Sequence, residues 1–165
     1  MFKRIGIVSN QTREGVDETL EQTVKFLLER DVDVIVGESA AELISHPKVR
    51  LVPETDVSKD RDLVIAIGGD GTMLRCGKAA FLNDVPILGI NLGRLGFLTD
   101  ISPRQLISGL TAILNGEFKD DERTVLHCEI VRSGKVIASA PGLNDVVIQK
   151  WNSARLITLD TTVNG

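Results

Sequence analysis

The sequence predicts an α/β protein whose two parts differ in the order and spacing of their apolar runs. From residue 5 to about 115, short β-branched runs alternate with helical patterns, which is typical of parallel strands joined by helices. After about residue 120 the apolar runs are closely spaced and separated by turns, which favours antiparallel pairing. At 165 residues and 42% hydrophobic content, the chain can bury a core but holds at most one large domain or two small ones. We therefore expect an N-terminal Rossmann-like parallel sheet with flanking helices, followed by the start of an antiparallel β-rich domain.

The parallel strands are predicted by apolar runs that follow one another along the first part of the chain. They are "IGIV" at 5–8, "VDVIV" at 32–36, "LVIAIG" at 63–68 and "VPILGIN" at 85–91. A helix is expected after each run, with only a shorter helical piece between the second and the third. These alternations define a first domain over residues 1–118.

The helices are predicted by spacing and by capping residues. Leu20, Val24, Leu27 and Leu28 lie at i, i+4, i+7 and i+8, which places them on one stripe of a helix. The last helix of the first domain begins at "SPRQ", where Ser102 is a cap and a proline takes the first helical position. Gly116 is expected to end it.

The second domain, residues 119–165, is predicted as the beginning of a β-rich domain that is incomplete in this chain. Its expected strands are "RTVLHCEIVR" at 123–132, "KVIASA" at 135–140, "NDVVIQK" at 144–150 and "ARLITLDTTV" at 154–163. Ser133 and Gly134 form the predicted hairpin turn between the first two.

Charge and composition exclude several classes of protein. The net charge of −4 argues against a non-specific nucleic-acid binder, which usually carries an excess of Lys and Arg. We find no apolar run long enough to span a bilayer and no signal peptide at the N-terminus, so we expect no membrane partner and a cytoplasmic location. Cys76 and Cys128 lie far apart without metal-ligand spacing, so both are expected to be reduced and buried.

The stretch "AIGGDGTML" at 66–74 carries the candidate site. It follows a buried strand and leads into a helix, the place where open α/β sheets bind ligands. Adjacent glycines allow a backbone conformation denied to other residues and let a ligand approach the main chain, and N–H groups at a helix start favour phosphate. Because the carboxylate of Asp70 would repel phosphate, we expect it to take a proton from an attacking hydroxyl or to act through a divalent cation. That combination suggests phosphoryl transfer to an alcohol.

A purely structural turn is the alternative, since Asp-Gly is a common turn dipeptide. A second glycine-rich stretch, "GINLGRLGFL" at 89–98, follows the next strand, so both turns should lie side by side at one sheet edge. Within it, Leu95 and Leu98 are expected to return the chain to the core, whereas Phe97 is left open between core and site.

Taken together, "GGDGT" at 68–72, "NLGRLGFL" at 91–98 and "LNDVVI" at 143–148 resemble the NAD kinase family in order and spacing. "GGDG" alone is shared with diacylglycerol, sphingosine and phosphofructokinases, whereas the three segments together are specific. The resemblance covers the chain from "IGIV" onward. It implies transfer of the γ-phosphoryl group of ATP, or the end of polyphosphate, to the ribose 2′-hydroxyl of NAD, with Mg²⁺ offsetting phosphate charge.

The resemblance also implies roles for individual residues. Asp70 matches the general base, while Asn144 and Asp145 match an Asn-acidic pair that binds the nucleotide. Arg155 falls where the family places a basic residue near the dinucleotide, with a solvated strand residue as the alternative. Arg75 either faces phosphate or is an exposed helix residue. The remaining implied binding residues are Gly68, Gly69, Gly71 and Thr72 in the loop, and Leu74 and Phe97 in the nucleotide pocket.

This sequence departs from the family in one respect. The family has a later glycine- and threonine-rich segment that resembles "TPTGSTAY", and this sequence does not contain it. The resemblance therefore implies a chain truncated within the C-terminal domain, and it leaves open whether this chain is active or assembles as the family's homodimers and homotetramers. The alternatives are a lipid or sugar kinase that shares "GGDG" and a non-catalytic nucleotide-binding fragment. The residues that would hold a metal stay unassigned.

Overall fold

The computed structural model describes residues 2–9, 14–93, 98–150 and 156–163. The chain divides into two compact units, Met1–Thr124 and Val125–Gly165. Within the described ranges, no helix is both long and apolar enough to cross a membrane.

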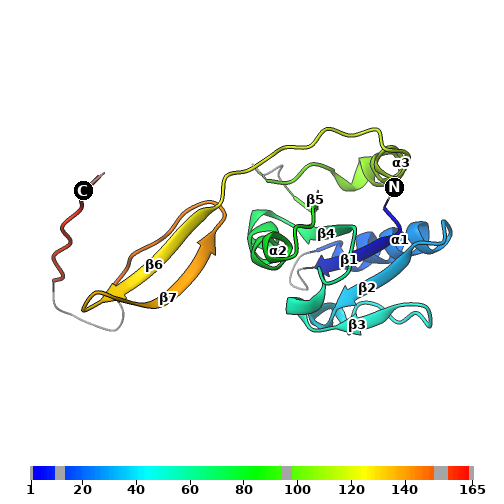
Figure 1. The fold of residues 1–165 in the computed structure, drawn as a ribbon. Helices are drawn as coiled ribbons and strands as arrows, with labels where there is room; N and C mark the ends of the chain where they lie inside the picture. The colour runs from blue at the N-terminus through cyan, green and yellow to red at the C-terminus, as the bar shows by residue number, and fades with distance from the viewer. Residues whose placement is uncertain (1, 10–13, 94–97, 151–155, 164–165) are drawn as a thin grey trace. The chain divides into compact units, whose positions relative to one another are not determined.

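The first unit is built on a five-stranded sheet in which every strand pair is parallel (Figure 1). The strand order is β3-β2-β1-β4-β5. The strands are β1 (Arg4–Ser9), β2 (Asp33–Gly37), β3 (Arg50–Val52), β4 (Leu63–Gly68) and β5 (Ile87–Asn91). Every residue of β4 is buried, because a strand covered on both faces needs no polar side. The expected parallel sheet is confirmed, and each of the four predicted runs overlaps a strand, namely β1, β2, β4 or β5.

Helices cover both faces of this sheet. α1 (Val16–Leu28) and α3 (Leu106–Asn115) pack on one face, and α2 (Asp70–Leu82) packs on the other. The predicted stripe of α1 is confirmed, since Leu20, Val24 and Leu27 are all fully buried. Short 3-10 helices, η1 (Glu38–Ala40), η2 (Glu54–Asp56) and η3 (Pro103–Gln105), join the larger elements.

The ends of the last helical region agree with the sequence prediction. Pro103 starts the turn of η3, which leads directly into α3. Gly116 ends α3 with φ of 83°, in the left-handed region that glycine adopts without strain.

The prediction between β2 and β4 was wrong in part. In place of one shorter helical piece, the chain forms η1, then β3, then η2. β3 is three residues long and pairs with the end of β2 at Ile35–Gly37. Three residues are too few to show the alternation of apolar and polar residues by which a strand is recognised. β3 also depends on pairing with another strand, so the local pattern could not predict it.

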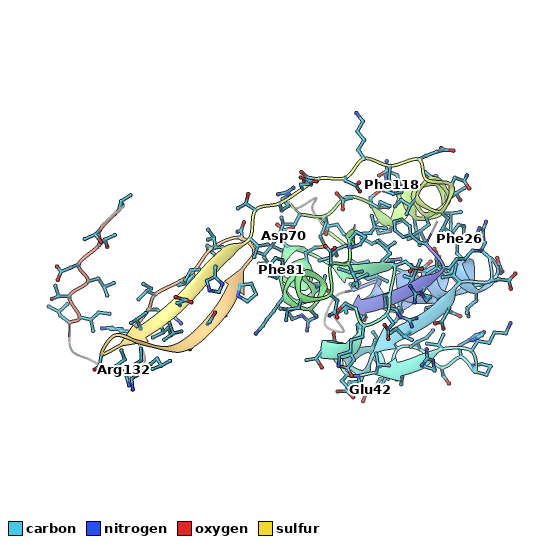
Figure 2. The ribbon with its side chains drawn as sticks, viewed as in Figure 1. Phe26, Glu42, Asp70, Phe81, Phe118 and Arg132 are labelled. Atoms are coloured by element: carbon cyan, nitrogen blue, oxygen red, sulfur yellow. The ribbon has the colours of Figure 1, made fainter. Side chains whose placement is uncertain are left out.

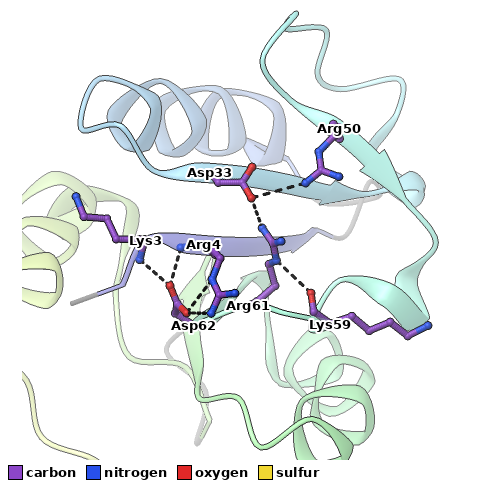
Figure 3. A network of polar contacts seen from close by, with 7 residues as sticks. All are labelled: Lys3, Arg4, Asp33, Arg50, Lys59, Arg61 and Asp62. Carbon is purple, nitrogen blue, oxygen red and sulfur yellow. Dashed lines mark hydrogen bonds and ion pairs between the residues drawn. The ribbon is translucent and has the colours of Figure 1, made fainter.

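Charged side chains tie the amino ends of three strands together (Figure 3). Asp62, just before β4, accepts hydrogen bonds from the backbone N–H groups of Lys3 and Arg4, each at 2.8 Å. Its other oxygen accepts from the Arg4 guanidinium at 2.7 Å. Arg61 donates to Asp33 on β2 at 2.6 Å. These contacts set the register of β1 and β2 relative to the start of β4.

The connections make β1 and β4 the switch point of the sheet. From β1 the chain passes through α1 to β2 on one side, whereas from β4 it passes through α2 to β5 on the other. Ser9 pairs with Ile67, so the two strands end next to each other. Open α/β sheets bind ligands at this position, where neighbouring chains leave in opposite directions.

The second unit is an antiparallel hairpin of β6 (Leu126–Arg132) and β7 (Lys135–Gly142). Ser133 and Gly134 connect the strands with φ of 51° and 74°, the two left-handed residues that a type I′ turn requires. The expected hairpin and its turn are confirmed.

Three other expectations for this unit were wrong. Residues 144–150 and 156–163 form no strand, although their composition suits one. A strand needs a partner's N–H and C=O groups, and within the described residues of this unit β6 and β7 pair only with each other. Cys128 is only half-buried because the residues of the hairpin are largely exposed, whereas Cys76 is buried as expected; both thiols are free.

Candidate active site

The glycine turn of the site forms the junction between β4 and α2. Gly68 is the last residue of β4, Gly69 precedes the helix, and Asp70 is the first residue of α2 (Figure 2). Gly69 has φ of −125° and ψ of −166°, an extended conformation open to any residue. The glycines are therefore not explained by a left-handed backbone, contrary to the expectation of a conformation denied to other residues.

Close packing explains Gly68. A Cβ there would overlap the Thr72 side chain, coming within 2.9 Å of the Thr72 Cβ. Thr72 itself is buried, with 2% of its surface exposed. The absence of a side chain at Gly68 thus lets the first turn of α2 sit directly on the end of β4.

The first turn of α2 has the features of an anion site. The N–H groups of Thr72 and Met73 bond the Gly69 carbonyl, whereas earlier N–H groups of a helix have no partner within it. Gly71 is exposed, and apart from its chain neighbours and the backbone of its own helix no atom of the described residues lies within 4 Å of where its Cβ would stand. A ligand could approach the main chain here, and the helix dipole favours a negative group.

The Asp70 carboxylate is held from the second glycine-rich stretch. Its Oδ1 accepts the backbone N–H of Leu98 at 3.1 Å. Leu98 is also partly buried against the α2 side of the core, as expected from the sequence. A residue predicted only to pack therefore also positions the carboxylate through its main chain.

The two glycine-rich turns lie side by side, as predicted. Gly68 pairs with Asn91 at the end of β5, and the Leu92 N–H donates to the Gly68 carbonyl at 3.2 Å. Asn91 is buried, and its Oδ1 accepts the N–H of Gly93 at 3.1 Å. The asparagine side chain thereby shapes the start of the second turn.

Arg75 brings a positive charge from α2 to the end of β1. Its Nη2 donates to the Ser9 carbonyl at 3.2 Å, although the residue is exposed. This single bond orients the guanidinium at the switch point and uses one of its five N–H donors. Ser9 is 1% exposed, and its hydroxyl has no hydrogen-bond partner among the described residues.

The other predicted site residues are distributed between the two units. Leu74 on α2 is 37% exposed. Asn144 and Asp145 belong to the second unit, where both are exposed just after β7. Phe97 and Arg155 lie outside the described residues. The structure therefore brings residues 68–72 and Arg75 together within the first unit.

The His, Cys, Asp and Glu side chains of the chain decide whether it could bind a metal ion or supply a nucleophile. Among the described residues, no group of three or more His, Cys, Asp or Glu side chains could hold a metal ion. Mg²⁺ usually takes one or two carboxylates together with substrate phosphates, and the carboxylate of Asp70 at the start of α2 fits that arrangement. On the buried side of α2, burial, together with the negative charge of Glu54, raises the pKa of Cys76 to about 12, so this thiol is not a nucleophile.

Sequence reasoning did not single out Ser9, Asn91 or the main chain of Leu98. Ser9 and Asn91 each end a strand at the carboxyl edge of the sheet. A polar residue that ends a buried strand was the available signal. The role of the Leu98 N–H had no signal, because every residue except proline carries that group.

Fold and site together define an open α/β-sheet protein with a carboxylate-bearing glycine turn at its switch point. Residues 5–118 match the family described as ATP-NAD kinase N-terminal domain. The chain belongs to this family.

Curated relatives agree over the whole chain. It is 37% identical to the NAD kinase of Chromohalobacter salexigens over 164 residues, which are 99% of this chain and 56% of the relative. It is 36% identical to the NAD kinase of Coxiella burnetii over 163 residues, 99% of this chain and 54% of that one. The chain thus spans about half the length of the curated relatives that it matches.

A solved structure supports the fold. The crystal structure of yeast NADH kinase complexed with NADH is similar at a TM-score of 0.73 and 24% identity. The similarity covers 86% of this chain and 47% of the yeast chain.

Proposed function

We propose that the protein to which this chain belongs is an NAD kinase. It transfers the γ-phosphoryl group of ATP, or the terminal phosphoryl group of polyphosphate, to the 2′-hydroxyl of the adenosine ribose of NAD and forms NADP. The observation that carries the proposal is Asp70, a carboxylate at the start of α2 where the dipole and glycine turn favour phosphate. Membership of the family supports the same reaction.

Asp70 acts as the general base. The 2′-hydroxyl oxygen forms a bond to the γ-phosphorus while the bond from that phosphorus to the leaving oxygen of ADP breaks. The hydroxyl proton passes to the carboxylate. The Leu98 N–H, at 3.1 Å from Oδ1, fixes one oxygen of the base and so limits rotation of the carboxylate.

The first turn of α2 and Arg75 bind the phosphates. Gly68 and Gly69 bring the backbone close, the exposed Gly71 leaves the approach open, and Thr72 supports the turn from beneath. Arg75, anchored by the Ser9 carbonyl, directs its other N–H groups to phosphate oxygens. Mg²⁺ bound with the nucleotide supplies charge neutralisation during transfer.

The remaining assignments follow the family. Leu74 and Phe97 line the nucleotide pocket, while Asn144, Asp145 and Arg155 contact the dinucleotide. The exposed amide and carboxyl groups at 144 and 145 suit hydrogen bonds to ribose or nicotinamide. A homodimeric or homotetrameric assembly and a cytoplasmic location belong to the same proposal.

The test is NADP formation from NAD, ATP and Mg²⁺, measured on the 165-residue chain and on the protein of full gene length. We expect product from the longer protein. Asp70→Asn keeps an oxygen that accepts the Leu98 N–H but removes the base, so kcat should fall by roughly 10²-fold or more, with little change in NAD binding. Asp120→Asn, which removes an exposed carboxylate from the same unit, is the matched control.

The outcomes separate the alternatives. Near-normal turnover by Asp70→Asn would contradict the assignment of the base. Folded, full-length protein that phosphorylates a lipid or sugar alcohol but not NAD would support the other GGDG kinases. Binding of NAD without turnover would indicate a nucleotide-binding module.

A further inference from the structure

The chain that carries Leu98 is attached to the outer edge of β5. The N–H groups of Asp100 and Ile101 both donate to the Gly89 carbonyl, at 2.9 and 3.0 Å, and the Asn91 N–H donates to the Ile101 carbonyl at 2.8 Å. Ile101 also forms a parallel bridge with Ile90. Residues 100 and 101 therefore extend the sheet by a short stretch on the side of β5 away from β4.

Asp100 adds a side-chain bond to this attachment. Its Oδ2 accepts the backbone N–H of Gly89 at 3.2 Å. On an edge strand such an N–H faces no neighbouring strand, and a bond to a carboxylate is stronger than one to a neutral acceptor. The side chain of Asp100 thus adds a hydrogen bond to the main-chain bonds that attach residues 100 and 101 to β5.

Gly89 is suited to this arrangement because it has no side chain. A Cβ at position 89 would stand 2.8 Å from the Thr99 Cα, 3.1 Å from the Leu98 carbonyl oxygen and 3.1 Å from the Met73 Sδ. The segment therefore passes directly over Gly89, on the face of β5 where Met73 of α2 also lies. Thr99, in the middle, is 6% exposed.

We propose that Asp100 is a positioning residue for Asp70. The connection runs from the Asp100 carboxylate to Gly89 on β5, and from Asp100 along two residues of chain to the Leu98 N–H, which meets Asp70 Oδ1 at 3.1 Å. The edge of β5, and not α2 alone, then sets the orientation of the carboxylate. The proposal rests on Asp70 being the base of the proposed kinase.

The positioning role predicts a specific kinetic signature. Asp100→Ala frees the Gly89 N–H and loosens the segment, so the Leu98 N–H no longer holds the base in place. A misplaced catalytic group affects turnover more than substrate binding, and displacements near 1 Å cost up to roughly 10²-fold. We expect kcat to fall by about 10- to 100-fold with KM for NAD changed less than about threefold.

The first experiment needs no activity. Amide hydrogen exchange of the 165-residue chain is compared for the wild type, Asp100→Ala, Asp100→Asn and the control Asp120→Ala. Asp100→Ala should speed exchange at Gly89 and Leu98 by about 10-fold or more, while amides of α1 keep their rates. Asp100→Asn retains an acceptor oxygen and should restore most of the protection.

The second experiment measures kcat and KM of the same variants in the full-length protein, at a temperature where circular dichroism shows each one fully folded. Recovery of kcat by Asp100→Asn, beside a loss in Asp100→Ala, supports positioning. If Asp100→Ala speeds exchange at Leu98 but leaves kcat unchanged, while Asp70→Asn still abolishes turnover, the positioning role is refuted and the kinase proposal stands.

A third variant covers the case in which Asp100→Ala does not fold. Gly89→Ala pushes residues 98 and 99 away from β5 and leaves Asp100 intact. It should lower kcat in the same way, and unchanged kcat in a folded Gly89→Ala protein would also overturn the proposal. Unchanged turnover of NAD by Asp70→Asn would instead contradict the assignment of Asp70 as the base, on which this proposal rests, and absence of NADP formation by the folded full-length wild type would contradict the proposed function itself.

Discussion

Replacing Asp62 with asparagine tests how firmly the amino ends of β1 and β4 are tied together. The Asp62 carboxylate accepts two backbone N–H groups and the Arg4 guanidinium, and 24% of its side-chain surface is exposed (Figure 3). Asparagine has the same shape, but an NH₂ group replaces one of the carboxylate oxygens. The N–H donors around that position then meet another donor and no longer an acceptor. The variant therefore removes the charge and some of these bonds without leaving a cavity.

The magnitude follows from the pKa of this carboxyl. The hydrogen bond from Arg4 is the main cause that lowers the pKa of Asp62 from its ordinary 3.8 to about 2, against the opposing effect of burial. The difference corresponds to at most about 2.4 kcal/mol of folding free energy at neutral pH. Because the pair is partly exposed, solvent screening reduces the expected loss in Asp62→Asn to about 1–2 kcal/mol.

The sign of the pH dependence is also determined. A carboxyl whose pKa is lower in the folded state stabilises the fold above the unfolded value of 3.8, and this contribution disappears as pH falls through about 2. The difference in unfolding free energy between wild type and Asp62→Asn should thus be full at pH 7 and shrink between pH 4 and pH 2.

Urea unfolding followed by circular dichroism at 222 nm measures this difference, because α1, α2 and α3 all lie in the first unit. Asp120→Asn, at an exposed position, should change the free energy of unfolding by less than about 0.5 kcal/mol. A difference for Asp62→Asn that is near zero at pH 7, or that stays constant down to pH 2, would refute the reasoning.

Three further predictions follow from burial and close packing. Gly68→Ala should destabilise the first unit by about 1–3 kcal/mol in the same urea assay, since its Cβ overlaps the buried Thr72 side chain; an unchanged midpoint would show that Thr72 can move aside. Leu27→Ala, at a fully buried core position, should cost about 2–5 kcal/mol, and a loss below 1 kcal/mol would contradict its place in the core. At pH 8 a thiol reagent should modify half-buried Cys128 and spare Cys76, whose pKa is raised to about 12 by burial, until urea unfolds the chain; equal rates in the folded protein would contradict this burial.

The position of the site could be predicted from local sequence. A fully apolar run, then Gly68 and Gly69, then a helical pattern, is enough to place Asp70 at the carboxyl end of a parallel strand. The second glycine-rich stretch after β5 could be placed beside it for the same reason. These features depend on residues close in sequence, whose conformational preferences act before any long-range contact forms.

The partners of the site residues could not be predicted. Arg75 is exposed on α2, which was one of the two alternatives from the sequence, but only the proximity of α2 to the end of β1 gives it the Ser9 carbonyl as a partner. The strands expected at 144–150 and 154–163 do not form within the described residues for a related reason, since strand formation needs a partner that local composition does not supply.

The sequence by itself determined the α/β class, the main strands and helices of the first unit, the Ser133–Gly134 hairpin, and a carboxylate at the switch point of a parallel sheet. Only the tertiary structure decided that β3 joins the sheet, that Gly68 is required by the packing of Thr72, and that Leu98 and Asp100 connect Asp70 to β5. The physical reason is that periodicity and turn preferences act over a few neighbouring residues, whereas these contacts join main-chain and side-chain groups that only the packing of strands and helices brings within hydrogen-bond distance.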